Sequence, residues 1–177
     1  MSGLDQDFRI LERVSSAVGD APAPQTNPVD GGQGAQKKRW SIPGIYSGTR
    51  ISTSFGEVPA HLIRVRDQLR TRDGDYVRVL RIDEYKLDAD FLADHPEARP
   101  IRFASKRTTP AGAVYLSPGQ RVLARSASGQ EVLKMAVDFT DQPGAIPDVP
   151  GPFSYFVFHL GKPALVRAEG MWISISE

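Results

Sequence analysis

Residue types that commonly act as nucleophiles, general bases or metal ligands are sparse in this chain. Its 177 residues include no cysteine, which excludes disulfide bonds, thiolate metal ligands and cysteine nucleophiles. The histidines stand far apart and form none of the short spacings of histidine metal sites: His61, His95 and His159. Chemistry by a hydroxyl group would need a base to activate it, and the sequence identifies none. The isolated residues therefore point to no catalytic centre of their own.

Three acids offer the best alternative for a metal site. Asp138, Asp141 and Asp148 share a loop rich in proline and glycine, DFTDQPGAIPDVPG. Calcium takes oxygen ligands, so these carboxylates are a calcium candidate, but their spacing matches no known calcium-binding loop. We therefore expect solvated loop acids, and predict neither a metal nor a cofactor.

Overall charge sets limits on the partner class. The chain has 22 basic and 21 acidic residues, a formal net charge of +1, whereas strongly electrostatic nucleic-acid binders are one-sided in charge. Two basic stretches, 37–39 beside Trp40 and 64–72, keep a nucleic-acid role open as an alternative. No apolar run approaches the ~20 residues of a membrane-spanning helix, and the first residues show no secretion signal. These patterns favour a cytoplasmic protein without a membrane span.

The first 39 residues differ from the rest in composition and hydrophobic pattern. An apolar stripe at helical spacing predicts an amphipathic helix over residues 1–19, formed by Leu4, Phe8, Leu11 and Val18. Residues 20–39 are rich in proline, glycine and small polar types, which predicts a flexible linker. The stripe has two interpretations that the sequence leaves equal. It packs on the chain's own domain, or it docks on another protein in the manner of a helix in a groove.

From residue 40 onward, short β-prone runs alternate with turn signals. The expected strands are 49–53, 76–82, 112–116, 121–125, 131–137 and 153–160, with a terminal hairpin of 164–168 and 171–176. A helical turn or two is expected between Leu87 and His95, before Pro96. The sequence therefore predicts an all-β domain over residues 40–177.

Four blocks of this region, in order, resemble the hedgehog/intein (Hint) domain family in its bacterial form. The first block spans Gly48 to Gly74, with the GTRI start and the later TRDG. The others are RPIR at 99–102, LSP with RVL at 116–123, and AEG at 168–170. The resemblance implies a horseshoe-like fold of short bent strands around a pseudo-twofold axis. It also implies self-cleavage, which starts when a cysteine or serine attacks its own preceding carbonyl.

The same resemblance places four chemical positions of the family on residues that cannot perform that chemistry. The nucleophile falls on Gly44, and the histidine of the SPxH block, which polarises the scissile amide, falls on Gln120. The family's aspartate and histidine of the last block fall on Gly161 and Pro163. A glycine cannot attack, and a carboxamide does not exchange protons near neutral pH. We expect the groove around these positions to persist as a shallow polar pocket.

Neighbouring hydroxyls and histidines are better explained structurally. Ser47 is expected in a turn and Thr49 at the family's scaffold threonine, rather than as relocated nucleophiles. His61 is expected at the surface, and His159 is interpreted as a hydrogen-bonded strand residue rather than a displaced catalytic histidine. The sequence thus predicts a catalytically inactive Hint-like domain that binds another protein, with Leu4, Phe8, Leu11 and Val18 as the docking residues. A self-cleaving domain that uses unrecognised residues is the main alternative.

Overall fold

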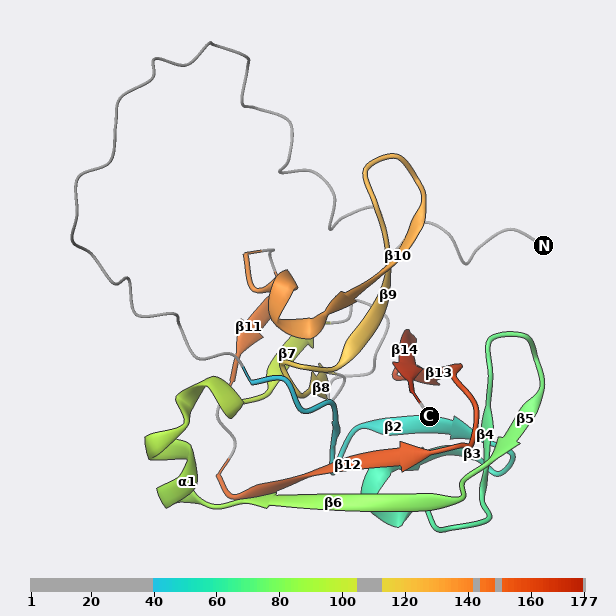
Figure 1. Ribbon diagram of the computed structural model, residues 1–177, viewed down its shortest axis with the longest axis horizontal. Helices are drawn as coiled ribbons and strands as arrows, with labels where there is room; N and C mark the ends of the chain where they lie inside the picture. Colours follow the sequence, from blue (N-terminus) through green and yellow to red (C-terminus); the bar gives the residue numbers. More distant parts are fainter. Residues whose placement is uncertain (1–39, 105–112, 142–143, 149–150, 177) are drawn as a thin grey trace, which may run out of the picture.

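The computed structural model describes residues 40–104, 113–141, 144–148 and 151–176. The expected helix of residues 1–19, the linker of residues 20–39 and the basic cluster 37–39 lie outside the described residues. Within the described part, strands dominate and belong to two antiparallel sheets (Figure 1). The all-β prediction is therefore confirmed for this part of the chain.

The first sheet contains six of the described strands. In spatial order they are β11 (Ala145–Pro147), β7 (Ile101–Ala104), β8 (Ala113–Leu116), β1 (Ile45–Tyr46), β12 (Phe153–His159) and β6 (Arg81–Leu87). The short β1 lies between β8 and β12, with Ile45 opposite Leu116 on one side and Phe156 on the other. This strand therefore places the residues just before it in the middle of the sheet.

The second sheet contains the remaining eight. Its main order is β10 (Glu131–Met135), β9 (Arg121–Arg125), β14 (Met171–Ile175), β13 (Ala164–Ala168), β2 (Arg50–Thr53), β4 (Gln68–Arg70) and β5 (Tyr76–Arg78), while β3 (Gly56–Pro59) pairs with β2. The predicted terminal hairpin is present, with Ala168 opposite Met171. Its two-residue loop, Glu169 and Gly170, has φ angles of 46° and 90°, as the favoured tight hairpin turn requires.

Residues 76–82 do not form the single strand that their sequence predicts. The chain passes from one sheet to the other at Val79 and Leu80. Val79 N donates to Asp67 O, on the side of β4, at 2.8 Å, and Leu80 N donates to His159 O, at the end of β12, also at 2.8 Å. The β-prone run at 76–82 is therefore divided between β5 and the start of β6, because the consecutive amides of Val79 and Leu80 donate to different sheets.

Helical structure in the described residues is short. Helix α1 (Ala89–Asp94) begins at Asp88, whose side chain accepts from Phe91 N at 2.8 Å, and ends before Pro96, as the sequence predicts. Three 3₁₀ turns add to it: η2 (Ala60–Leu62), η3 (Pro96–Ala98) and η4 (Ala136–Phe139). The turn η4 replaces the end of the strand expected over 131–137, because Asp138 Oδ2 accepts from Met135 N and turns the chain.

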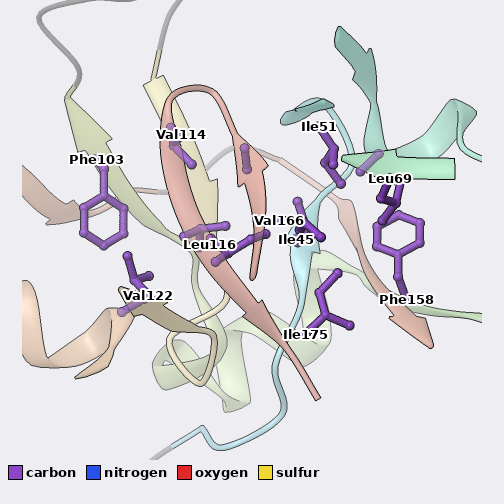
Figure 2. Packing of buried hydrophobic residues seen from close by; sticks show 14 of the residues in the cluster. Ile45, Ile51, Leu69, Phe103, Val114, Leu116, Val122, Phe158, Val166 and Ile175 are labelled. Carbon is purple, nitrogen blue, oxygen red and sulfur yellow. The ribbon is translucent and has the colours of Figure 1, made fainter. Parts of the chain in front are cut away.

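The interior has two apolar clusters. The larger lies between the sheets and includes Ile45, Leu116, Val166 and Phe158, which Figure 2 shows packed with their neighbours. A smaller cluster covers β12 near α1 and consists of Leu87, Leu92, Ala98, Phe153 and Tyr155, with Trp40 and Tyr46 at its edge. The segment that leads into β1 therefore runs beside both clusters.

Candidate functional site

Gly44 and Gln120, the positions that the resemblance assigns to the nucleophile and to the histidine, lie side by side. Gly44 comes just before β1 and Gln120 just before β9. Gly44 N donates a hydrogen bond to Gln120 Oε1 at 3.2 Å across a buried contact, although the residues are 76 positions apart. The fold thus brings the carboxamide to the amide nitrogen that the family would cleave. We call this place the Gly44–Gln120 junction.

Two further hydrogen bonds fix the orientation of the Gln120 carboxamide. Its Nε2 donates to Ser174 O at 2.7 Å and to Arg121 O at 3.1 Å, and the residue is only 3% exposed. A flipped amide would set its donors against Gly44 N–H and its oxygen against two carbonyl oxygens. The oxygen must therefore face Gly44 N, so this amide nitrogen meets an acceptor rather than a proton donor.

The residues that precede Gly44 are held by the turn at 117–120. Ser117 Oγ donates to Ile42 O at 2.6 Å and accepts from Trp40 Nε1 at 3.0 Å, while Ser117 N donates to Gly44 O at 2.9 Å. Ser117 is fully buried. Its hydroxyl proton and a lone pair are thus committed to neighbours, which leaves it a positioning group rather than an activated nucleophile.

A glycine in the same turn allows this close approach. A Cβ at Gly119 would lie 2.5 Å from Ser41 C and 2.6 Å from Ser41 O. Because backbone atoms cannot move aside as a flexible side chain can, a larger residue here would push the lead-in segment away. The sequence signal for this contact was the SPG turn itself, but nothing in the sequence showed what would pack against it.

Tyr155 closes the Gly44–Gln120 junction from β12. A Cβ at Gly44 would lie 2.8 Å from Tyr155 Cβ, and Tyr155 is fully buried with its hydroxyl donating to Ala98 O at 2.8 Å. Burial raises the pKa of the Tyr155 phenol well above its ordinary value, so the group is a neutral donor. Gly44, Ser117, Gln120 and Tyr155 are all buried, so these residues do not line the polar pocket that the sequence led us to expect.

The two hydroxyl residues near Gly44 are Thr49 and Ser47. Thr49 Oγ1 donates to Tyr115 O at 3.0 Å and accepts from Tyr115 N at 3.2 Å, which ties the start of β2 to β8. Ser47 lies in the turn between β1 and β2, and its carbonyl oxygen is 2.7 Å from His61 Nδ1. His61 is exposed, as expected. The Thr49 hydroxyl is therefore engaged by the backbone of β8, and the expectation that Ser47 lies in a turn is confirmed.

Gly161 and Pro163 lie elsewhere, in the exposed turn between β12 and β13. Gly161 and Pro163 follow the end of β12, whereas the β12 residue that a Cβ at Gly44 would meet is Tyr155. Gly161 has φ +72°, and a Cβ there would meet Leu80 Cδ1 at 2.7 Å. The structure thus brings together two of the four assigned positions and leaves the other two at a distance.

His159 belongs to a charged cluster at the surface. Its Nε2 is 2.8 Å from Asp83 Oδ2, and Arg81, its cross-strand neighbour on β6, donates to Asp83 Oδ2 at 3.1 Å. The hydrogen bond from His159 and the charge of Arg81 lower the pKa of the Asp83 carboxyl below its ordinary value. No serine or threonine hydroxyl in the described part of the chain is hydrogen-bonded to His159. The expectation of a hydrogen-bonded strand histidine is therefore confirmed.

Trp40 is engaged by the domain. Besides its hydrogen bond to Ser117, its ring meets Phe91 edge-on at a centroid distance of 5.9 Å, and Phe91 in turn packs on His95 at 4.5 Å. This half-buried indole is not the open stacking platform that a single-stranded nucleic acid would use.

The loop acids are partly engaged as well. Asp148 Oδ2 accepts from Tyr115 Oη at 3.1 Å and lies 3.8 Å from Arg102 Nε. Among the described residues, no group of three or more histidine, aspartate or glutamate residues is placed to hold a metal ion. No described helix is long and apolar enough to cross a membrane.

Comparison with known proteins gives a family and a set of distant structural neighbours. The family profile described as "Hint domain" matches residues 43–174. Similar solved structures include the MchDnaB-1 intein, with 12% identity, a TM-score of 0.48, and coverage of 73% of this chain and 98% of that chain. The gp41-1 intein has 10% identity and a TM-score of 0.46, with coverage of 77% of this chain and 100% of that chain. A bacterial intein-like domain from Clostridium thermocellum has 11% identity and a TM-score of 0.42, with coverage of 76% of this chain and 98% of that chain. No curated protein matches the sequence.

Proposed function

The chain belongs to the Hint domain family, and we propose that it is a member that does not cleave itself and that acts as a protein-binding or assembly module. The single observation that carries the first half of this proposal is the hydrogen bond from Gly44 N to Gln120 Oε1. Breaking the bond between Pro43 and Gly44 requires a nucleophile at the carbonyl carbon and a proton for the departing nitrogen.

Neither requirement is met at the Gly44–Gln120 junction. Gly44 has no side chain, and Tyr155 occupies the space where a Cβ would stand. The acceptor oxygen of Gln120 faces the nitrogen, and both carboxamide protons are given to backbone carbonyls. This arrangement stabilises the intact amide and offers its nitrogen no proton.

The binding half of the proposal rests on the combination of a retained fold with an unreactive junction. The segment before β1 is held by Ser117 and Trp40, so the domain keeps its lead-in chain as part of its own packing. The N-terminal stripe of Leu4, Phe8, Leu11 and Val18 is the proposed docking element, because an amphipathic helix of that length needs a surface to pack on.

Intact-mass measurement of the full-length protein tests the first half. We expect the 19.4 kDa chain to stay whole over days at neutral pH with an added thiol or hydroxylamine. Gly44→Cys alone should also stay whole, because it adds a nucleophile without a proton donor. Two fragments divided between Pro43 and Gly44, in either protein, would contradict the proposal.

A pair of glycine substitutions keeps that result interpretable. Gly44→Ala introduces the Cβ that meets Tyr155, whereas Gly151→Ala adds a Cβ with no atom within 4 Å at an ordinary φ. We expect Gly44→Ala to destabilise the domain by about 1–3 kcal/mol and Gly151→Ala to have little effect. Equal melting temperatures would show that the Gly44–Gln120 junction tolerates a side chain, and would remove the steric argument.

A further inference from the structure

The outer face of the β4–β5 hairpin combines arginine, tyrosine and leucine side chains in the open. Along β5, Val77 is buried, so Tyr76 and Arg78 lie on the opposite side, and the exposed Leu80 follows where the chain crosses to β6. Tyr76 is 49% exposed and Leu80 is 57% exposed. Two large apolar side chains close together in the sequence are thus presented to solvent.

The partner strand adds to the same face. Arg70 lies opposite Tyr76 and Gln68 lies opposite Arg78, and both β4 residues are exposed. We call Gln68, Arg70, Tyr76, Arg78 and Leu80 the hairpin face. Within the described residues, neither Arg70 nor Arg78 has a side-chain hydrogen bond or ion pair, whereas Arg72 donates to Glu131 Oε2 at 2.7 Å.

The place of the hairpin in the fold leaves this face accessible. Strand β5 ends the order of the second sheet, and Figure 1 shows the β4–β5 hairpin at the end of β6 that is away from α1. Arginine and tyrosine are residue types enriched at the centres of protein interfaces. Two unpaired cations in addition favour a partner that is apolar and acidic.

The chain contains a segment of that description. At 100° per residue, the helix predicted for residues 1–19 would set Asp5 and Glu12 on one flank of the apolar stripe and Asp7 on the other. Arg9 and Arg13 would lie on the far side of the helix. An acid-flanked apolar stripe complements a hairpin face in which cations flank Tyr76 and Leu80.

We propose that the N-terminal segment, residues 4–18, docks in cis on the hairpin face. Leu4, Phe8 and Leu11 pack against Tyr76 and Leu80, and the flanking carboxylates meet the guanidinium groups of Arg70 and Arg78.

The tether makes a contact within one molecule the favoured case. Residues 19–39 span up to about 70 Å when extended, while a domain of the size of residues 40–177 has a radius of gyration of about 14 Å. The segment can therefore reach any face. A flexible linker, as the sequence predicts for residues 20–39, gives an effective concentration on the order of millimolar, which exceeds that of a second copy in ordinary solutions.

This inference deepens the proposed function and rests on it only in that the stripe is a docking element. It identifies the surface that holds the stripe in the isolated molecule, so that a protein partner would have to compete with the hairpin face. Self-cleavage is tested separately by intact mass, and its outcome leaves the docking experiment unaffected.

Paramagnetic broadening in the full-length protein tests the proposal directly. Because the chain has no cysteine, Ser16→Cys gives a single site for a nitroxide label, on the far side of the predicted helix from the stripe. We expect selective broadening of backbone amide signals from residues 68–80 in ¹⁵N spectra of dilute protein, relative to those of the β9–β10 hairpin. The broadening should be lost in Phe8→Asp and in Arg70→Glu/Arg78→Glu, and should decrease in high salt.

A matched charge reversal on another hairpin serves as the control. Arg121→Glu/Lys134→Glu changes two exposed cations of β9 and β10 and should leave the pattern intact. Broadening seen only after mixing labelled chains with separate ¹⁵N chains would place the segment on a second copy and overturn docking in cis. Uniform broadening, or broadening that survives Arg70→Glu/Arg78→Glu, would overturn the assignment to the hairpin face.

Discussion

Strand β12 contributes to two regions that differ in almost every respect. At Tyr155 it closes the Gly44–Gln120 junction, where the polar groups are neutral, buried and hydrogen-bonded to backbone atoms. Four residues later, at His159, it carries a cluster with Asp83 and Arg81 in which each side chain keeps contact with solvent. The first region contains Gly44 and Gln120, neither of which has a titratable side chain. The second has titratable groups without a hydroxyl to activate among the described residues.

The contrast predicts that substitutions in the two regions will change the stability of the fold by different amounts. Groups buried away from water are costly to leave unpaired, so a change at the Gly44–Gln120 junction should act on folding. Exposed charges are screened by solvent, so a change in the cluster should act weakly and only in a limited pH range. Matched substitutions in the two regions can test this difference.

The largest effect is expected from a pair of tyrosines that face each other across β12 and β6. Tyr155 is fully buried, whereas Tyr85, directly opposite, is 39% exposed. Tyr155→Ala leaves a cavity beside Gly44 and removes the donor to Ala98 O, so we expect a loss of about 3–5 kcal/mol in the free energy of unfolding. Tyr85→Ala should cost less than about 1 kcal/mol. Urea denaturation of both variants measures the difference, and equal losses would show that the two members of this cross-strand pair do not differ in burial as described.

Placement of Tyr155 was only partly foreseeable from sequence. The strand 153–160 was predictable from its apolar run, and the confirmed strand ends one residue earlier, at His159. That Tyr155 would cover Gly44 depends on β1 being inserted between β8 and β12, and a two-residue strand has too few side chains to produce a periodic signal. The family motifs predicted the fold class because they contain scaffold residues such as Thr49, whose hydrogen bonds with Tyr115 tie the start of β2 to β8 of the other sheet.

The misplaced expectations have physical causes as well. The break at Val79 and Leu80 follows from hydrogen bonds to two different sheets, which no local propensity encodes. The expected shallow polar pocket rested on the retained motif residues Thr49, Arg50, Ser117 and Arg121, and it stays a prediction. At the Gly44–Gln120 junction itself, the absence of a Cβ at Gly44 allows Tyr155 to approach, and Gln120 uses its whole carboxamide on backbone groups. The sequence assigned the family's positions to residues, and only packing could show what surrounds those residues.

An intermediate effect is expected at Gln120. Gln120→Met keeps a similar volume but leaves Gly44 N–H and Ser174 O without partners in a buried place, which should cost about 2–3 kcal/mol. Gln130→Met is the matched control, because Gln130 is exposed in the β9–β10 turn and should change stability by less than about 0.5 kcal/mol. Melting curves of both variants give the comparison. A Gln120 variant as stable as the control would mean that water replaces the lost hydrogen bonds, and that the Gly44–Gln120 junction is open to solvent.

The smallest effect is expected in the charged cluster, and its pH dependence identifies it. The folded-state pKa of Asp83 is lowered, chiefly by the hydrogen bond from His159. A lowered folded-state pKa means that ionised Asp83 stabilises the fold above its unfolded pKa of about 4, and that this contribution disappears as the pH falls through the folded-state pKa. Asp83→Asn should therefore be slightly less stable than the natural chain near neutral pH and equal to it in strong acid.

Urea midpoints of the natural chain and of Asp83→Asn, measured from about pH 7 down to about pH 2.5, test this expectation. Asp141→Asn is the control, since Asp141 is exposed and no hydrogen bond or ion pair involves its side chain within the described residues. That variant should follow the natural chain at every pH. A difference for Asp83→Asn that is constant over the whole range would mean that the side chain contributes through packing rather than charge. The cluster would then resemble the Gly44–Gln120 junction more closely than its exposure suggests, and the distinction between the two ends of β12 would have to rest on burial alone.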